Sequence, residues 1–211
     1  MATAIIQFDD RPAESLAPFV ELVRRNQRYA AAHGYDHLFI DEIDLDIPMF
    51  WVKPFLVADL LATRYDTVLW LDTDAVVHNL TRTVESLFTD AAAMVFSPDN
   101  PLWQSTFNAG VFACNKPALP ILREWCDRYP KEQWLKNERG EWKCLHEQWA
   151  GPAFEQGAFV ESILPKYAET GLLKSLPWTT LQSPLPTEDA FSLHFSAYFK
   201  WNIELYLAAN A

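Results

Sequence analysis

Apolar runs and longer amphipathic segments alternate through the first 72 residues, and this alternation restricts the fold more than any other feature of the sequence. Three strand-like runs are separated by two helix-like stretches, in the order 4–8, 14–32, 36–41, 51–65 and 67–72. Gly34 suits the C-cap of the first helix, and Pro54 suits the first turn of the second. Apolar strands that alternate with helices are typical of a parallel sheet covered on both faces. We therefore expect an α/β fold with a mostly parallel central sheet flanked by helices.

Two further strands and one helix are predicted later in the chain, at residues 92–97, 109–114 and 119–129. The segment after residue 150 is less regular, because prolines interrupt any long element: Pro165, Pro177, Pro184 and Pro186. No internal repeat or change of composition marks a domain boundary. Residues 1–211 are therefore expected to form a single domain.

The charge balance disfavours several classes of partner. Lys and Arg total 17 against 28 Asp and Glu, which gives a net charge of -11. This charge disfavours binding to nucleic acid and to an anionic membrane surface. An anionic ligand would need a metal ion or a few well-placed cations to be held. Half of the residues are apolar, so the chain can bury a real core and is expected to be globular.

Three cysteines, Cys114, Cys126 and Cys144, are odd in number and lack CxxC spacing. They indicate neither a disulfide framework nor a zinc cluster, and a reducing compartment is the simpler interpretation. No segment approaches the ~18 to 20 apolar residues of a membrane span, and no signal peptide is recognisable. We expect a cytoplasmic protein without direct membrane insertion.

Two carboxylates, Asp72 and Asp74, end the apolar run Val68–Leu71. If the backbone stays extended through Thr73, both side chains point to the same side and can share a ligand. Ligands of parallel sheets bind at the carboxyl ends of strands, where Asp9 also falls. Two chemistries need acids at this spacing: holding a divalent cation against a diphosphate, and direct attack on a phosphate ester.

The second chemistry is that of haloacid-dehalogenase-type phosphatases, whose apolar strand and DxDx(T/V) motif resemble DTDAVV here. In those enzymes the first Asp attacks phosphorus and the second handles the proton. Their motif usually lies on the first strand and needs a later acidic pair for Mg²⁺. Here two strands precede it, and Thr187-Glu188-Asp189 is a poor substitute for that pair. The phosphatase interpretation is therefore kept as an alternative.

Four blocks accompany the acid pair: Lys53, FNAGVFACNKP at 107–117, LHEQWAGPAF at 145–154 and LHFSAYFKW at 193–201. Together they resemble retaining GT-A glycosyltransferases, in pattern closest to glycogenin and its family 8 relatives and to the family 34 galactosyl- and xylosyltransferases. The matching blocks cover about half of the chain. The resemblance implies a Rossmann-like GT-A fold in which about residues 1–115 bind the nucleotide sugar. About residues 116–211 would lie on the acceptor side and complete the metal site.

The resemblance also implies a set of donor-binding residues. Asp72, Asp74 and His194 would coordinate Mn²⁺ or Mg²⁺ between the phosphates of a UDP-sugar, although His194 lies 120 residues after Asp74. Lys53 and Lys200 would contact the diphosphate. Gln7, Phe8 and Asp9 would contact the uridine. Asp99 and Asn108 would bind the sugar hydroxyls, with Ala109 and Gly110 allowing close approach of the backbone, and Thr73 is a further implied donor contact.

Glu147 and Gln148 are the residues that the resemblance places near the anomeric carbon, as catalytic groups. Family members often have Asp in place of Glu147 and a glycine in place of Ala197, so the sequence departs from the pattern at both positions. Most of the nine tryptophans suit a core. Four lie in or beside the matched loops as candidate sugar platforms: Trp103, Trp142, Trp149 and Trp201.

These residues predict a metal-dependent retaining glycosyltransferase. It would move a hexosyl, pentosyl or deoxyhexosyl unit from a UDP-sugar to a hydroxyl of a glycan or glycoprotein. The alternatives are the phosphatase and a non-catalytic sugar-nucleotide-binding domain; a nucleotidyltransferase is disfavoured because no Gly-rich basic loop follows the first strand. Such a chain fits a bacterial cytoplasmic enzyme, or a large DNA virus that glycosylates its proteins in the host cytoplasm.

Overall fold

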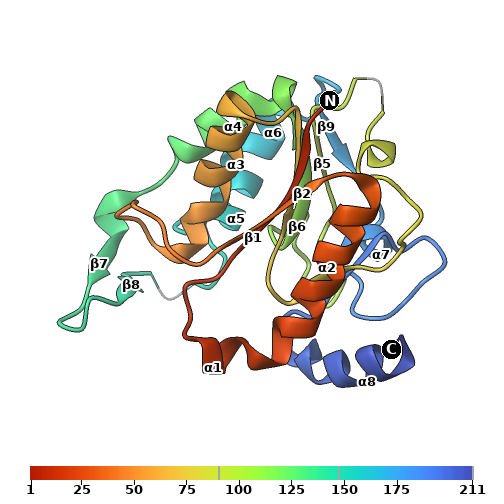
Figure 1. The fold of residues 1–211 in the computed structure, drawn as a ribbon. Helices are drawn as coiled ribbons and strands as arrows, with labels where there is room; N and C mark the ends of the chain where they lie inside the picture. The colour runs from red at the N-terminus through yellow and green to blue at the C-terminus, as the bar shows by residue number, and fades with distance from the viewer. Residues whose placement is uncertain (90, 147, 211) are drawn as a thin grey trace.

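The computed structural model describes residues 1–89, 91–146 and 148–210, and a six-stranded sheet lies at its centre (Figure 1). The strands follow in the spatial order β2 (Asp36–Ile40), β1 (Thr3–Phe8), β3 (Thr67–Leu71), β6 (Val111–Asn115), β5 (Met94–Phe96) and β9 (Leu173–Ser175). Strand β6 runs antiparallel to both of its neighbours, and the other three pairings are parallel. The predicted mostly parallel α/β sheet is confirmed.

Helices cover both faces of the sheet, as expected (Figure 1). One face carries α3 (Val52–Thr63), α4 (Leu119–Cys126), α5 (Glu155–Ala158) and α6 (Leu164–Tyr167), with a π-helical turn at Phe159–Ile163 between the last two. The other face carries α2 (Val20–His33) and α7 (Trp178–Leu181), with α1 (Ala13–Leu16) and α8 (Asn202–Ala209) beside α2. Gly34 ends α2 with a φ of 71°, as a C-cap glycine should. No helix among the described residues has the length and apolar character needed to cross a membrane.

Alternate strand residues divide between two apolar layers. Ile6 and Trp70 face the layer under α3 and α4, whereas Ile5 and Leu69 face the layer under α2 and α7. All four side chains are buried, and burying one such side chain contributes about 1.5 to 3 kcal/mol. Strand β2 lies at the edge and is partly exposed, so the burial expected for every strand holds for β1 and β3 but not for β2.

Two smaller sheets complete the fold. Strand β4 (Ala75–Val77) pairs antiparallel with β10 (Ser192–His194), so a segment near the C-terminus lies directly beside the chain that follows β3. Strands β7 (Trp134–Lys136) and β8 (Trp142–Cys144) form a hairpin that projects from the side of the molecule (Figure 1). Of these, the β4–β10 ladder is the one that shapes the candidate site.

Candidate functional site

A cavity of about 1040 Å³ opens where strands β1 and β3 end. This is the edge at which ligands of parallel α/β sheets bind. Most of the residues predicted from the sequence line this cavity: Phe8, Asp9, Lys53, Asp72, Thr73, Asp74, Asp99, Asn108, Gly110, Gln148, His194 and Lys200. Gln7 and Ala109 are not among its lining residues, and Glu147 lies outside the described residues.

The backbone between the two acids is not extended. Asp72 to Ala75 form a β-turn, in which the Ala75 N–H donates to the Asp72 carbonyl at 2.9 Å. The Asp72 N–H donates to the Gly110 carbonyl at 2.7 Å, which attaches the turn to the start of β6. The condition of extended backbone through Thr73 is therefore not met. The turn nevertheless brings both carboxylates to one site.

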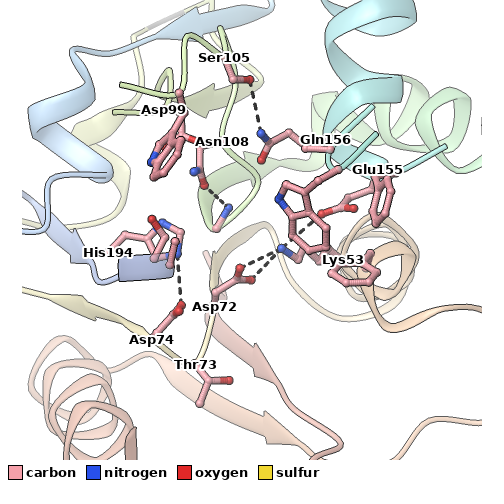
Figure 2. A pocket seen from close by; sticks show the side chains of 18 of the residues that line it. Lys53, Asp72, Thr73, Asp74, Asp99, Ser105, Asn108, Glu155, Gln156 and His194 are labelled. Atoms are coloured by element: carbon pink, nitrogen blue, oxygen red, sulfur yellow. Dashed lines mark hydrogen bonds and ion pairs between the residues drawn. The ribbon is translucent and has the colours of Figure 1, made fainter. Parts of the chain in front are cut away.

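The β4–β10 ladder adds an imidazole to the two acids. His194 lies opposite Ala75 in the ladder and therefore beside Asp74, with its Nε2 3.2 Å from the Asp74 Oδ1. One ligand atom from each of Asp72, Asp74 and His194 lies within 4.8 Å of the other two (Figure 2). Two carboxylates and an imidazole suit Mg²⁺ or Mn²⁺. These three residues, here called the candidate metal site, therefore fit a divalent cation.

Two lysines lie against these carboxylates. Lys53 Nζ is 3.0 Å from Asp72 and 3.4 Å from Glu155 (Figure 2), and Lys200 Nζ is 3.4 Å from Asp74. Burial disfavours the charged form of Lys53, but Asp72 and Glu155 outweigh it and raise the pKa of the amine. Burial raises the pKa of Glu155, although Lys53 opposes the effect. Lys53 therefore stays a cation, whereas the acidity of Glu155 is weakened.

Gly110 is needed for the position of His194. A Cβ built on Gly110 would lie 2.2 Å from Cε1 of the His194 ring, closer than any real contact. The imidazole thus packs directly on the Gly110 backbone at the point where β6 begins. Larger residues at this position would push the ring away from Asp74.

Gln182, which no sequence pattern singled out, orients the His194 ring. Its Nε2 donates to the carbonyls of Val111 at 2.9 Å and Asn108 at 3.2 Å. With the amide nitrogen held there, the Gln182 Oε1 faces the His194 Nδ1 at 2.8 Å. An amide oxygen can only accept, so Nδ1 carries the proton. In the neutral ring the lone pair is then on Nε2, the nitrogen beside Asp74, where a cation would bind.

The predicted sugar-contacting residues form a connected wall. Asn108 Oδ1 accepts from the Gly110 N–H at 2.7 Å, and burial raises the pKa of Asp99. Ala109 contributes its backbone: its N–H donates to the Gln156 Oε1 at 3.1 Å, and its carbonyl accepts from Lys53 Nζ at 3.4 Å. This wall therefore links the acid end of the cavity to helix α5.

Another Glu-Gln pair, Glu155 and Gln156, opens helix α5 and lines the cavity. Figure 2 shows Glu155 directed at Lys53 and Gln156 at Ser105. The sequence pattern indicated only the pair Glu147 and Gln148, of which Gln148 lines the cavity. The signal that could have found Glu155 and Gln156 is the same dipeptide repeated at the start of a helix.

The three candidate uridine contacts at the end of β1 have different environments. Gln7 is fully buried; its Nε2 donates to the Asp72 carbonyl at 3.3 Å, and its Oε1 accepts from Asn26 at 3.2 Å. Phe8 and Asp9 line the cavity. Asp9 pairs with Arg11 at 2.5 Å, a cation that also lines the cavity and that sequence reasoning missed. Gln7 thus supports the turn that carries Asp72 rather than the cavity surface.

Ala197 stands where the family pattern has a glycine, and its backbone has a conformation typical of glycine. Its φ is 48°, in the left-handed region, where a glycine has no steric penalty and an alanine does. The segment after His194 therefore keeps the glycine-type backbone conformation without the glycine.

The four candidate sugar platforms separate into two groups. Trp103 and Trp149 line the cavity, whereas Trp142 and Trp201 are not among its lining residues. Trp142 belongs to the projecting hairpin, in strand β8. The cavity lining therefore supports only Trp103 and Trp149 as candidate sugar platforms.

The sequence matches no protein-family model, and no curated protein is detectably similar to it. The fold, by contrast, is similar to a glycosyltransferase involved in the glycosylation of the major capsid of PBCV-1. That similarity has a TM-score of 0.71 and 17% identity, over 99% of this chain and 100% of the viral one.

Two further glycosyltransferases of solved structure are also similar in fold. The glycosyltransferase GlyE of Streptococcus pneumoniae TIGR4 gives a TM-score of 0.61 and 16% identity, over 99% of this chain and 60% of GlyE. The galactosyltransferase LgtC, solved with donor and acceptor sugar analogs, gives a TM-score of 0.54 and 12% identity, over 97% of this chain and 94% of LgtC. These neighbours are GT-A glycosyltransferases, and this chain has the GT-A fold.

Proposed function

We propose that this protein is a metal-dependent retaining glycosyltransferase that uses a UDP-sugar donor and an acceptor hydroxyl on a glycan or glycoprotein. The observation that carries the proposal is the meeting of Asp72, Asp74 and His194 with two lysines in one cavity of a GT-A fold. The protein is acidic overall, with a net charge of -11. In such an acidic protein, a site that can hold a dication and that carries two amines suits a diphosphate.

The cation would be held by Asp72, Asp74 and His194, and when bound it would supply positive charge next to the leaving diphosphate. Lys53 and Lys200 act at the same end of the cavity. Their amines, both within 3.4 Å of the acids, are placed to donate to phosphate oxygens as negative charge grows there. Neutralising that charge lowers the barrier to breaking the bond between sugar and diphosphate.

Sugar transfer exchanges one bond at the anomeric carbon for another. The bond to the diphosphate oxygen breaks and its electron pair leaves with the diphosphate. The acceptor oxygen forms the new bond, and its proton passes to a base. Asp99, Asn108 and Gln156 are placed to hold the donor sugar, since all three line the cavity beside the acids. Retention at the anomeric carbon is part of the proposal, and Glu155 joins Glu147 and Gln148 as a candidate group beside that carbon.

The phosphatase alternative has less support. Its mechanism needs a second acidic pair next to the first, and Glu188 and Asp189 are exposed and do not line the cavity. Asp189 instead accepts hydrogen bonds from Thr179, Thr180 and Thr187. A non-catalytic sugar-nucleotide-binding domain would keep the metal site and would release no UDP with any acceptor.

The acceptor and the cellular site belong to the proposal as well. The PBCV-1 enzyme acts in glycosylation of a capsid, and its whole chain is covered by the similarity. A glycan or glycoprotein acceptor in the cytoplasm of a bacterium, or of a virus-infected host, is the corresponding proposal for this chain.

The test is a thermal-shift and hydrolysis panel of nucleoside diphosphate sugars with Mn²⁺ or Mg²⁺. We expect at least one UDP-sugar to raise the melting temperature only when the metal is present, and to be hydrolysed slowly to UDP. His194→Ala should abolish the metal-dependent shift, whereas a phosphatase would keep its activity with that substitution. If no nucleoside diphosphate sugar stabilises the protein with Mn²⁺, the glycosyltransferase proposal fails.

A further inference from the structure

Three aromatic side chains that line the cavity are unusually open to solvent. Trp103 is 43% exposed, Trp149 is 70% exposed and Tyr198 is 80% exposed. They come from three separate segments: the loop between β5 and β6, the loop before α5, and the 3-10 helix Ala197–Trp201 that follows His194. Exposed apolar surface that gathers at a concave site usually marks a binding surface. These three residues are called the aromatic rim below.

The backbone next to each rim residue is strained. Among the described residues, three that are not glycine have a positive φ: Gln104 at 56°, Ala150 at 54° and Ala197 at 48°. Each is the direct chain neighbour of a rim residue, and each lines the same cavity. Such conformations cost free energy and persist where the surrounding structure imposes them, often at ligand sites. The strain therefore coincides with the rim and with no other described part of the chain.

Each rim residue is anchored by another aromatic ring, so that its position is defined although it is exposed. Trp103 and Tyr198 stack on one another, with ring centroids 6.2 Å apart and planes 26° apart. Trp149 packs edge-on against Phe50 at 5.2 Å and also contacts Phe154 at 5.1 Å. Anchored aromatic faces lose little conformational entropy when a ligand covers them.

The cavity chemistry near the rim differs from that near the candidate metal site. Neutral hydrogen-bonding side chains that line the cavity lie close in the chain to the two rim tryptophans: Gln104 and Ser105 follow Trp103, and Gln148 precedes Trp149. Charged groups that suit a diphosphate lie at the metal site instead. The cavity, at about 1040 Å³, is slightly larger than the ~300 to 1,000 Å³ of single-ligand pockets. It therefore has room and separate chemistry for a second ligand.

We propose that the aromatic rim binds the acceptor, and that the acceptor is an uncharged saccharide. A sugar ring has an apolar C–H face that fits an aromatic ring, and its hydroxyls fit amide and hydroxyl side chains. This proposal rests on the proposed function, because it assigns the second substrate of the same reaction. The rim shares its cavity with the metal site, so an acceptor hydroxyl held there faces the donor.

The test measures saccharide binding separately from donor binding. Neutral methyl glycosides and disaccharides are screened by saturation-transfer NMR against the whole protein, with and without Mn²⁺ and UDP. The variants are Trp103→Ala, Trp149→Ala and Tyr198→Ala. Two controls match them: Leu102→Ala, an exposed residue of the same loop, and Trp201→Ala, an exposed tryptophan, neither of which lines the cavity. Thermal melts check that each variant is folded.

We expect the rim variants to weaken saccharide binding at least about tenfold, more than they weaken Mn²⁺–UDP binding, with both controls unchanged. The rim proposal is overturned if no neutral saccharide binds in either condition, or if the rim variants bind as well as the controls do. It is also overturned if the rim variants change only self-association, measured by light scattering, because the rim would then be an interface between copies. If the unmodified protein does not bind Mn²⁺–UDP, the proposed function itself is refuted. Failure of the rim proposal and failure of the proposed function are therefore distinguishable.

Discussion

Replacing Gln182 tests whether the orientation of His194 controls cation binding. Gln182→Met keeps the length of the side chain but removes both the oxygen that faces His194 Nδ1 and the nitrogen that holds two carbonyls. Gln182→Glu keeps an oxygen toward Nδ1, but it loses the donors to the carbonyls and places a second carboxyl oxygen against them. The pair therefore separates the effect on the imidazole from the effect on the backbone.

The magnitudes follow from the three hydrogen bonds of Gln182. At about 1 kcal/mol for each buried hydrogen bond, either variant should lose about 2 to 3 kcal/mol of the free energy of unfolding. Typical domain stability is about 5 to 15 kcal/mol, so both should still fold. Removing the partner of a metal-ligating histidine weakens metal binding about 10- to 100-fold, or about 1.4 to 2.7 kcal/mol. Only Gln182→Met should show this second loss.

The assay is a Mn²⁺ titration by calorimetry at a temperature where both variants are folded, with urea unfolding in EDTA to measure stability. Nitrogen-15 NMR of the imidazole adds a direct readout: the Nδ1–H form should dominate in the unmodified protein and in Gln182→Glu at a pH where the ring is neutral. The reasoning is refuted if Gln182→Met binds Mn²⁺ as tightly as the unmodified protein. It is equally refuted if Gln182→Glu loses as much Mn²⁺ affinity as Gln182→Met does.

Three further predictions follow from single contacts. Gly110→Ala should lower Mn²⁺ affinity by more than about 100-fold and stability by about 1 to 3 kcal/mol, because its Cβ overlaps the His194 ring; unchanged calorimetric binding would contradict this. Ala197→Gly should raise the free energy of unfolding in urea by about 0.5 to 1 kcal/mol, since relief of the left-handed strain exceeds the added chain entropy; a destabilised variant would show that Ala197 is not strained. The hydrogen bond from Lys166 helps to lower the pKa of Glu124 from 4.5 to about 2. Glu124 should therefore stabilise the fold above pH 4.5, and this contribution should be lost as the pH falls toward 2. Glu124→Gln should flatten the acid limb of a stability-against-pH curve, and an unchanged limb would refute the ion-pair account.

The layered architecture could be predicted from the sequence because burial leaves a direct pattern. Residues 4–6 and 68–71 are apolar throughout, and both runs lie in central strands that are buried on both faces. The order of the strands and the reversed direction of β6 could not be predicted, because they depend on which backbones pair across the sheet. The side-chain pattern of one strand does not indicate which strand pairs with it.

The candidate site was predictable to the extent that its residues follow strands or match a motif. Asp72 and Asp74 could be found from their place after an apolar run, but the turn at Thr73 could not, because a bond from Asp72 to Gly110 stabilises it. His194 was reached only through resemblance, since the β4–β10 ladder alone brings it to Asp74. Gln182 gave no signal, because a glutamine after a short helix has the same local sequence whether or not it contacts a histidine.

The β4–β10 ladder ties cation binding to the order in which the chain folds. Its three residue pairs join segments on either side of a loop longer than half of the chain, and such long-range closure forms late and costs chain entropy. A nascent chain that ends at residue 190 already contains all six strands of the main sheet, and both acids, but no His194. A cation would therefore stabilise this late contact specifically, and would distinguish molecules that have completed folding from those that have formed only the central sheet.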